Sequence, residues 1–431
     1  MCLRRAGLAA FSLAGVLPLA CVLAGCEDRP RSNPLDPGNP ATGGGPSGFG
    51  ALAAHESVRL AWRAAPVGTT LLGFFLERRT LPSTVFSAVG DILPPTSTGA
   101  FDAGLANDST YEYRLSYVTV DSTIAGRSAL STASPGPELI WVSDPGADEI
   151  ARMTPDGRNR FLTISGALTV NRLAVDPSDG ALWATEPLDG RIKIFDTDGS
   201  PLAVFGGPVQ PNAIAVDALS GTAWVCDEFA NVAQRFDRSG GVQATTAVLG
   251  QPSDVAPTGA GDVWIVDQGG DTGPGQVLRV TASGAALTTL PVGSDPRRVA
   301  VDLLDGSIWV SRFDAGEIQH LSPTGAELHR IGGLQGPYAI DIDEFRNIVW
   351  VGLDGANAVL ALNRGTGATI RTVTGIARPR GVAVVDRTGE VWIASISEGE
   401  VVRLASDGTV LGRIGGFEAP FDVRVDPGPR P

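Results

Sequence analysis

Tryptophan recurs at a nearly constant interval through the C-terminal two thirds of this 431-residue chain. A turn glycine stands sixteen residues after most of these tryptophans, in contexts such as TPDG, DTDG and DRSG that favour tight hairpin turns. The regularity predicts a structural repeat of 40 to 45 residues. Seven of the eight tryptophans belong to it, at successive intervals of 42, 41, 40, 45, 41 and 42 residues: Trp141, Trp183, Trp224, Trp264, Trp309, Trp350 and Trp392.

Each repeat contains short apolar runs and no segment with helical periodicity. A proline precedes most of the tryptophans by thirteen residues and leads into runs such as AIAVD and RVAVD. Runs such as IWV and AWV are continuously apolar, which is typical of strands buried on both faces. Four strands per repeat with a period in the low forties is the pattern of a β-propeller. We therefore expect an all-β propeller over residues 138–431.

The two ends of this array complement each other. The first unit begins at Ile140 and Trp141 without its proline-led strand, whereas the chain ends with APFDVRVD, a proline-led strand with no tryptophan after it. We expect this last strand, residues 420–426, to complete the blade of Trp141. Seven blades then close into one ring.

The repeat units resemble those of the NHL family. PNAIAVD, AWVCD and FDRSG match that family's pattern of a proline-led inner strand, a strand ending in Asp and a glycine-marked hairpin. The resemblance covers about residues 138–427 and implies a propeller without a particular function, because such propellers host both binding and catalysis. Many NHL propellers have six blades, and the seven-bladed propellers of the YncE type show a similar pattern.

The N-terminus has the features of an export signal. Arg4 and Arg5 precede an apolar run over residues 6–23, and Leu-Ala-Gly-Cys follows, ending at Cys26. This tetrapeptide resembles the bacterial lipobox, which implies that residues 1–25 are a lipoprotein signal peptide and that Cys26 carries lipid. A lipid anchor would hold the protein in the cell envelope, on the outer membrane or facing the periplasm or exterior, without a membrane-spanning helix. Residues 26–48, rich in Pro and Gly, are expected to form a flexible tether.

Residues 49–137 alternate in the manner of short strands and predict a separate domain. SVRLAW with Trp62, then GFFLERR, then Leu105 six residues before Tyr111 resemble a fibronectin type III sandwich with its buried tryptophan and tyrosine corner. An immunoglobulin-like sandwich of another type is the alternative. Either module is expected to act as a spacer.

Composition excludes several kinds of function. The formal net charge of −14 argues against a nucleic-acid partner. His320 and His329, expected as surface residues of one hairpin, and His55 do not form a zinc-binding pattern. Neither a G-x-S-x-G motif nor a phosphate-binding loop occurs. The sequence therefore indicates no catalytic residues and no cofactor.

Charged residues mark one face of the predicted propeller. They stand three residues after a tryptophan or near the start of an inner strand, so they are expected around one end of the channel as exposed turn residues, beside a four-residue insertion in the loop 268–276. Such a ring could hold a divalent cation or a zwitterionic or sugar-acid ligand. Alternatively, the aspartates accept backbone hydrogen bonds within their turns. The candidate residues are Asp144, Glu186, Asp227, Asp254, Asp267, Arg298, Arg312, Arg380 and Asp422.

Two classes of function fit these observations. The first is a non-catalytic binding or scaffold module for a protein, glycan or peptide partner. The second is a propeller enzyme, similar to streptogramin-type lyases or lactonases, that uses the carboxylates and a divalent cation. The absence of a plausible general-base histidine on the channel face favours the first class.

Overall fold

The computed structural model describes residues 33, 35–36, 39 and 44–426, except for 55, 67, 108, 136–138, 168, 247–249 and 271–272. The expected signal peptide (1–25), Cys26 and residues 427–431 lie outside this part. The described residues form an all-β structure with 36 strands and no α-helix. Consequently, no helix among them is long and apolar enough to span a membrane.

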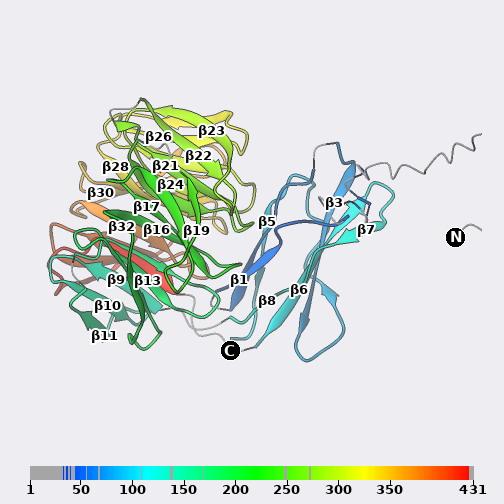
Figure 1. The fold of residues 1–431 in the computed structure, drawn as a ribbon, viewed down its shortest axis with the longest axis horizontal. Coiled ribbons are helices and arrows are strands. Elements are labelled where there is room, and N and C mark those ends of the chain that lie inside the picture. Colours follow the sequence, from blue (N-terminus) through cyan, green and yellow to red (C-terminus); the bar gives the residue numbers. More distant parts are fainter. Residues whose placement is uncertain are drawn as a thin grey trace, which may run out of the picture.

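Most strands belong to seven four-stranded antiparallel sheets, an arrangement consistent with a β-propeller (Figure 1). The innermost strands are β12 (Arg172–Val175), β16 (Pro211–Asp217), β20 (Pro252–Pro257), β24 (Pro296–Val301), β28 (Pro337–Asp343), β32 (Pro379–Val384) and β36 (Asp422–Asp426). The second strands are β9 (Leu139–Asp144), β13 (Leu182–Glu186), β17 (Thr222–Asp227), β21 (Val263–Asp267), β25 (Ile308–Arg312), β29 (Ile348–Leu353) and β33 (Val391–Ser395). We call residues 139–426 the propeller domain.

Two further strands complete each sheet on the outside. The third strands are β10 (Glu149–Met153), β14 (Arg191–Phe195), β18 (Val232–Phe236), β22 (Gly275–Val280), β26 (Glu317–Leu321), β30 (Ala358–Asn363) and β34 (Glu400–Leu404). The outermost are β11 (Arg160–Ser165), β15 (Pro201–Gly206), β19 (Val242–Thr246), β23 (Ala286–Gly293), β27 (Glu327–Ile331), β31 (Thr369–Thr374) and β35 (Val410–Ile414).

Burial explains the continuous apolar runs of the second strands. Every repeat tryptophan lies on a second strand with at most 1% of its surface exposed, because both faces of that strand are covered by neighbouring sheets. Trp224, for example, shares one core cluster with Val255 and Ile265 of the next sheet. The sheets are therefore joined by hydrophobic packing on both sides.

The C-terminal strand belongs to the first sheet, as the sequence predicts. β36 pairs antiparallel with β9, with Asp422 opposite Ser143 and Arg424 opposite Trp141. Figure 1 shows this strand in red beside β9. β36 also contacts β12 and β32, and each other innermost strand contacts its successor, so the innermost strands follow one another around a channel.

The N-terminal domain (residues 44–135) consists of two sheets that share one core. Trp62 and Phe74 lie at its centre, and the hydroxyl of Tyr111 accepts a hydrogen bond of 2.9 Å from the backbone N–H of Ala106. Its strands are β1 (Gly50–Ala54), β2 (Ser57–Ala61), β3 (Leu71–Thr80), β4 (Ser87–Ala88), β5 (Gly99–Ala103), β6 (Tyr111–Thr119), β7 (Ile124–Arg127) and β8 (Ser131–Ala133).

Part of the expected tether lies against this domain. Leu35 packs on its core, and Gly44 and Gly45 are buried so closely against β7 that a Cβ on Gly126 would overlap the carbonyl of Gly44. At these described positions the chain is held by contacts rather than free in solvent.

The β1-β2-β5 sheet of the N-terminal domain covers one end of the propeller domain. Arg59 on β2 lies 3.0 Å from the carboxyl group of Glu344 and 2.8 Å from that of Asp386, and the rings of Phe101 and Phe345 pack with centroids 3.9 Å apart. Glu344 and Asp386 follow the C-terminal ends of β28 and β32. The N-terminal domain therefore closes the channel end at which the innermost strands finish.

Candidate functional site

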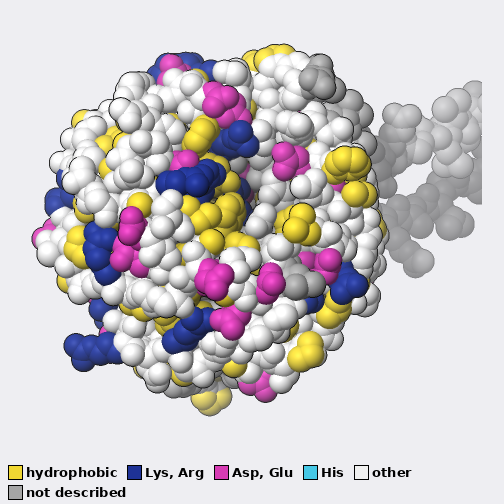
Figure 2. Space-filling view, turned by 90° about the vertical axis from the view of Figure 1, so that its left-hand side faces the viewer, with side chains coloured by type: hydrophobic (Ala, Val, Ile, Leu, Met, Phe, Trp, Pro, Cys, Tyr) yellow, Lys and Arg dark blue, Asp and Glu magenta, His cyan; other side chains and the backbone are white. Residues whose placement is uncertain are grey.

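The channel is open on the side turned away from the N-terminal domain. The innermost strands begin on that side, so their first residues surround what we call the open mouth, defined by Arg172, Arg298, Tyr338, Arg380 and Phe421. Figure 2 shows this side of the molecule, with a central hollow where Lys or Arg side chains border hydrophobic ones.

Behind the mouth lies a cavity of about 400 Å³ lined by all seven innermost strands. Going inward, its wall changes from charged to mainly apolar, and charged residues return at the far end with Arg59, Glu344 and Asp386. The charged level contains Arg172, Asp254, Arg298 and Asp422; two residues further along the strands come Ala174, Ala215, Ala256, Ala300, Asp341, Ala383 and Arg424. Next to the N-terminal domain the wall is formed by Val175, Val216, Pro257, Val301, Ile342, Val384 and Val425.

Three arginines from three sheets converge on Tyr338 at the mouth. The guanidinium carbons of Arg380, Arg298 and Arg172 lie 4.3, 4.8 and 6.0 Å from the centre of the tyrosine ring. Arg298 also donates to the Tyr338 hydroxyl (3.0 Å) and to Asp254 (3.1 Å). Cations at these distances are attracted to the face of an aromatic ring, which keeps the cluster together.

Arg172 has donors without partners. Only 3% of its side chain is exposed, and its Nη1 lies 3.3 Å from Asp422. Its Nε and Nη2 are buried and have no hydrogen-bond partner. Among the described arginines, only Arg172 has a buried Nη atom without a hydrogen-bond partner. Burial of unpaired donors of a charged group is costly, so these atoms indicate a site for an acceptor.

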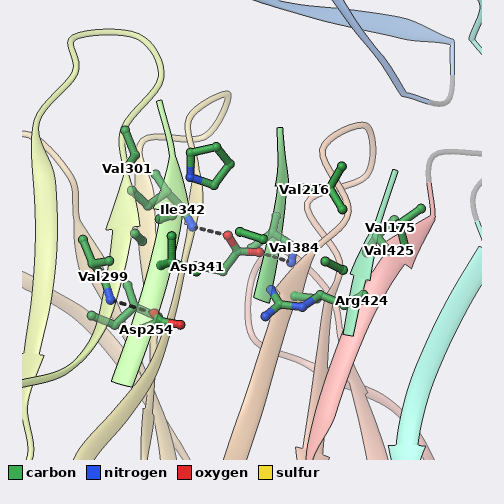
Figure 3. Close-up of a pocket in the computed structure, with 18 of the residues that line it drawn as sticks. Val175, Val216, Asp254, Val299, Val301, Asp341, Ile342, Val384, Arg424 and Val425 are labelled. Atoms are coloured by element: carbon green, nitrogen blue, oxygen red, sulfur yellow. Dashed lines mark hydrogen bonds between the residues drawn. The ribbon is translucent and has the colours of Figure 1, made fainter. Parts of the chain in front are cut away.

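Three carboxylates in the channel tie neighbouring sheets together. Each accepts a backbone N–H from the next innermost strand: Asp254 from Val299 at 3.0 Å, Asp341 from Val384 at 2.7 Å, and Asp422 from Leu173 at 3.0 Å. Figure 3 shows the first two bonds. Burial raises the pKa of Asp254 and of Asp341 to about 6.

Arg424 reaches into the hollow of the channel. Its Nε donates to Asp422 (3.2 Å) and to the carbonyl of Leu173 (3.0 Å). Although it lies on the innermost strand β36, 38% of its side chain is accessible, because it borders the cavity, where Figure 3 shows it among other lining residues. Asp341 and Arg424 were not among the sequence candidates. They could have been found, since most other repeats have alanine at this position.

The aspartates that follow the tryptophans stabilise turns. Asp144 accepts the N–H groups of Glu418 and Ala419 at 2.9 and 2.8 Å, and Asp227 accepts that of Ala230 at 2.9 Å. One oxygen of Asp267 accepts three backbone N–H groups at 2.8 to 3.0 Å, from Gly250, Gln251 and Gly269. All three aspartates are at most 2% exposed. The expectation of exposed turn residues is wrong for them, and the alternative of backbone hydrogen bonding describes them.

The other sequence candidates lie apart from the arginine cluster or bind its members. Glu186 is fully buried, with Lys193 Nζ 2.6 Å from its Oε1, and burial raises its pKa. Arg312 pairs with Glu317 at the edge of its sheet. Arg380 pairs with Asp354 at 3.0 Å. Of the loop 268–276, residues 271–272 lie outside the described part.

The two described histidines are away from the cavity. Their Nδ1 atoms lie 2.9 Å apart on β26 and β27, and the His320 ring stacks on Trp309 with centroids separated by 4.0 Å. His320 is only 4% exposed, so its expected place on the surface is wrong. Burial lowers its pKa to about 4, which keeps it neutral. Within the described residues, no group of three or more His, Cys, Asp or Glu side chains could hold a metal ion.

Solved structures share the fold at low sequence identity. A functionally unknown protein from Desulfotomaculum acetoxidans DSM 771 is 16% identical, with a TM-score of 0.58 over 68% of this chain and 99% of that one. Hydrazine synthase from Kuenenia stuttgartiensis is 13% identical (TM-score 0.56; 62% and 92% covered), and virginiamycin B lyase from Staphylococcus aureus 16% (TM-score 0.51; 57% and 84%).

No protein-family model and no curated protein matches the chain. The structural neighbours and the four-stranded sheets together fit a β-propeller. At these identities the likeness extends to the fold alone.

Proposed function

We propose that this protein is a non-catalytic lipoprotein of the cell envelope whose propeller domain binds a ligand or partner at the open mouth. The observation that carries the proposal is the buried guanidinium of Arg172, whose Nε and Nη2 have no partner, at the entrance of a cavity of about 400 Å³. Binding sites are typically cavities of this size with a few convergent polar groups. A glycan, a peptide or the edge of a protein partner could present the matching acceptor.

The proposed architecture is an NHL-like ring of seven blades preceded by a fibronectin type III-like spacer. Seven four-stranded sheets with innermost strands in successive contact support the ring. The fully buried Trp62 and the hydrogen bond from Ala106 to Tyr111 support the spacer, because both match the resemblance in its sequence. The spacer covers one end of the channel, so the open mouth points away from it.

Membrane attachment through Cys26 is the second part of the proposal. Lipid at Cys26 would place the N-terminal domain nearer the membrane and the open mouth further from it. Cys26→Ala should move the protein from the membrane fraction to the soluble fraction of the envelope. Retention of this variant in membranes would contradict lipidation at Cys26.

The alternative of a cation-dependent lyase or lactonase has less support. The oxygens of Asp144, Asp227 and Asp267 are occupied by backbone N–H groups, so they are poorly placed to bind a cation. Neither His320 nor His329 lines the cavity. The likeness to a lyase extends to the fold and adds nothing about catalysis.

Binding can be tested with the Cys26→Ala protein on glycan and peptide arrays, followed by mass spectrometry of each bound compound. Binding at the mouth should disappear in Arg380→Ala and persist in Arg158→Ala, a control whose side chain is 88% exposed on an outer hairpin. Equal binding by both variants would place the site elsewhere. Chemical conversion of a bound compound would favour the enzyme.

A further inference from the structure

We propose that the open mouth binds a small monocarboxylic acid, with the carboxylate held by Arg172, Arg380 and the hydroxyl of Tyr338. This inference rests on the proposed binding function and adds the chemistry of the ligand. It is carried by unpartnered donors, by the balance of charge in the channel and by the change from a charged to a mainly apolar wall.

The first step concerns the donors. Arg172 offers Nε and Nη2, which are adjacent on one edge of the planar guanidinium. This edge matches the two oxygens of a carboxylate, so a single acid group could satisfy both atoms at once. Arg172 is 3% exposed and lies over the rings of Phe421 and Tyr338, so a carboxylate would reach these two atoms once one of the rings moves aside.

Tyr338 supplies a further donor. Its oxygen accepts a hydrogen bond from Arg298 Nη2, which leaves the phenolic proton for an acceptor in the mouth. Arg380 lies over the same ring at 4.3 Å and contributes positive charge beside the hydroxyl-bearing ring. An anion between these groups would meet donors from innermost strands of several sheets.

The charge balance favours an ion with one negative charge. Four arginines and three aspartates line the channel from the mouth to its middle, and 4 − 3 leaves one positive charge there; the far end adds Arg59 and the carboxyl groups of Asp217, Glu344 and Asp386. The ion pair of Arg380 with Asp354 is shared with Arg378, so Asp354 and Arg378 together add no net charge. A dianion such as phosphate would leave excess negative charge beside Asp254 and Asp422. The groups counted are Arg172, Arg298, Arg380, Arg424, Asp254, Asp341 and Asp422.

The inner wall favours an apolar body behind the carboxylate. Beyond the charged level the cavity is bordered mainly by alanine and valine side chains, with Asp341 and Arg424 among them, and Arg59 of the N-terminal domain lies at its far end with Glu344 and Asp386. A volume of about 400 Å³ accommodates an acid with a compact apolar group. Such a ligand would enter and leave through the mouth.

Calorimetric titration of the Cys26→Ala protein at pH 7 tests the proposal, with benzoate, benzamide and inorganic phosphate as probes. Benzoate should bind at least about tenfold more tightly than benzamide, which has the same shape without the charge. Phosphate should bind more weakly than benzoate. Equal binding of benzoate and benzamide, no binding of benzoate, or tighter binding of phosphate would each overturn the proposal.

Two variants test whether benzoate binds at the open mouth. Tyr338→Phe removes one hydroxyl and should weaken benzoate binding about tenfold, while Arg172→Gln should weaken it further. Arg158→Gln should bind as the parent does. If Arg172→Gln does not fold, the effect of Tyr338→Phe on benzoate binding alone decides whether the site is at the open mouth. If neither Tyr338→Phe nor Arg172→Gln changes the affinity for benzoate, the proposal is overturned.

The failure of this inference is distinguishable from failure of the proposed function. A neutral glycan or peptide that binds at the mouth, together with no preference for benzoate over benzamide, would refute the carboxylate and leave the binding function intact. Absence of every ligand from the mouth in both experiments would refute both.

Discussion

Raising the pH from 5.5 to 8 should weaken the contact between the two domains, because Glu344 must lose a proton in a buried position. Its side chain is 1% exposed and lies 3.0 Å from Arg59. Burial raises the pKa of Glu344 from 4.5 to about 8 despite Arg59, and the carboxylates of Asp386 and Asp302 add to the increase. The folded protein therefore holds a proton that the unfolded chain releases. This contribution to stability is complete below pH 4.5 and is lost as the pH rises through 8.

The size of the effect follows from these two pKa values. A difference of one bound proton changes the free energy of unfolding by about 1.4 kcal/mol per pH unit. For a pKa of 4.5 in the unfolded chain and about 8 in the folded one, integration between pH 5.5 and 8 gives a loss of about 3 kcal/mol. Glu344→Gln keeps the neutral shape and has no proton to lose, so this contribution disappears.

The measurement is urea unfolding of the parent, Glu344→Gln and the exposed control Glu398→Gln at both pH values. Asp254 and Asp341 titrate in all three proteins, so their contribution cancels in the comparison. The parent and the control should lose about 3 kcal/mol more than Glu344→Gln over this range. A parent and a Glu344→Gln variant that agree within about 0.5 kcal/mol would refute the reasoning.

Two other substitutions test hydrogen bonds of the backbone in each domain. Asp267→Ala leaves three buried N–H groups without their acceptor and should lower the free energy of unfolding by about 3 kcal/mol, whereas the exposed Asp314→Ala should change it by less than about 0.5. Equal effects in urea unfolding would show that the carboxylate is dispensable. Tyr111→Phe removes the acceptor for the Ala106 N–H and should cost about 1 kcal/mol, and an unchanged thermal midpoint would contradict the role assigned to that hydroxyl.

The tryptophan period predicted the positions of the sheets because repetition multiplies a weak signal. One apolar run such as AWV is ambiguous, but seven in register with a turn glycine define where strands begin and end. The unmatched halves at the two ends of the array gave the pairing of β36 with β9 in the same way. Both inferences depend on comparing positions within the chain.

Contacts that occur once in the molecule could not be predicted from such comparisons. Arg59 and Glu344 are 285 residues apart in different domains, and neither stands out from its surroundings in sequence. Residue type also does not show in which direction a turn carboxylate points, which is why Asp267 was expected to be exposed. By contrast, a comparison of the repeats could have identified Arg424, because it replaces an alanine that recurs at this position.

The membership of β36 in the first sheet affects when the protein can fold during synthesis. Ser143 on β9 pairs with Asp422 on β36, which is 279 residues later in the chain. The innermost strand of this sheet is therefore absent until those residues have been synthesised. At a synthesis rate of roughly 5 to 20 residues per second, that interval lasts about 15 to 60 s. During this time one edge of β9, a strand that is buried in the final structure, has no partner and can pair with other chains. The propeller domain should therefore reach its native state only after the whole chain has been made, and its yield should depend on how well that edge is protected in the meantime.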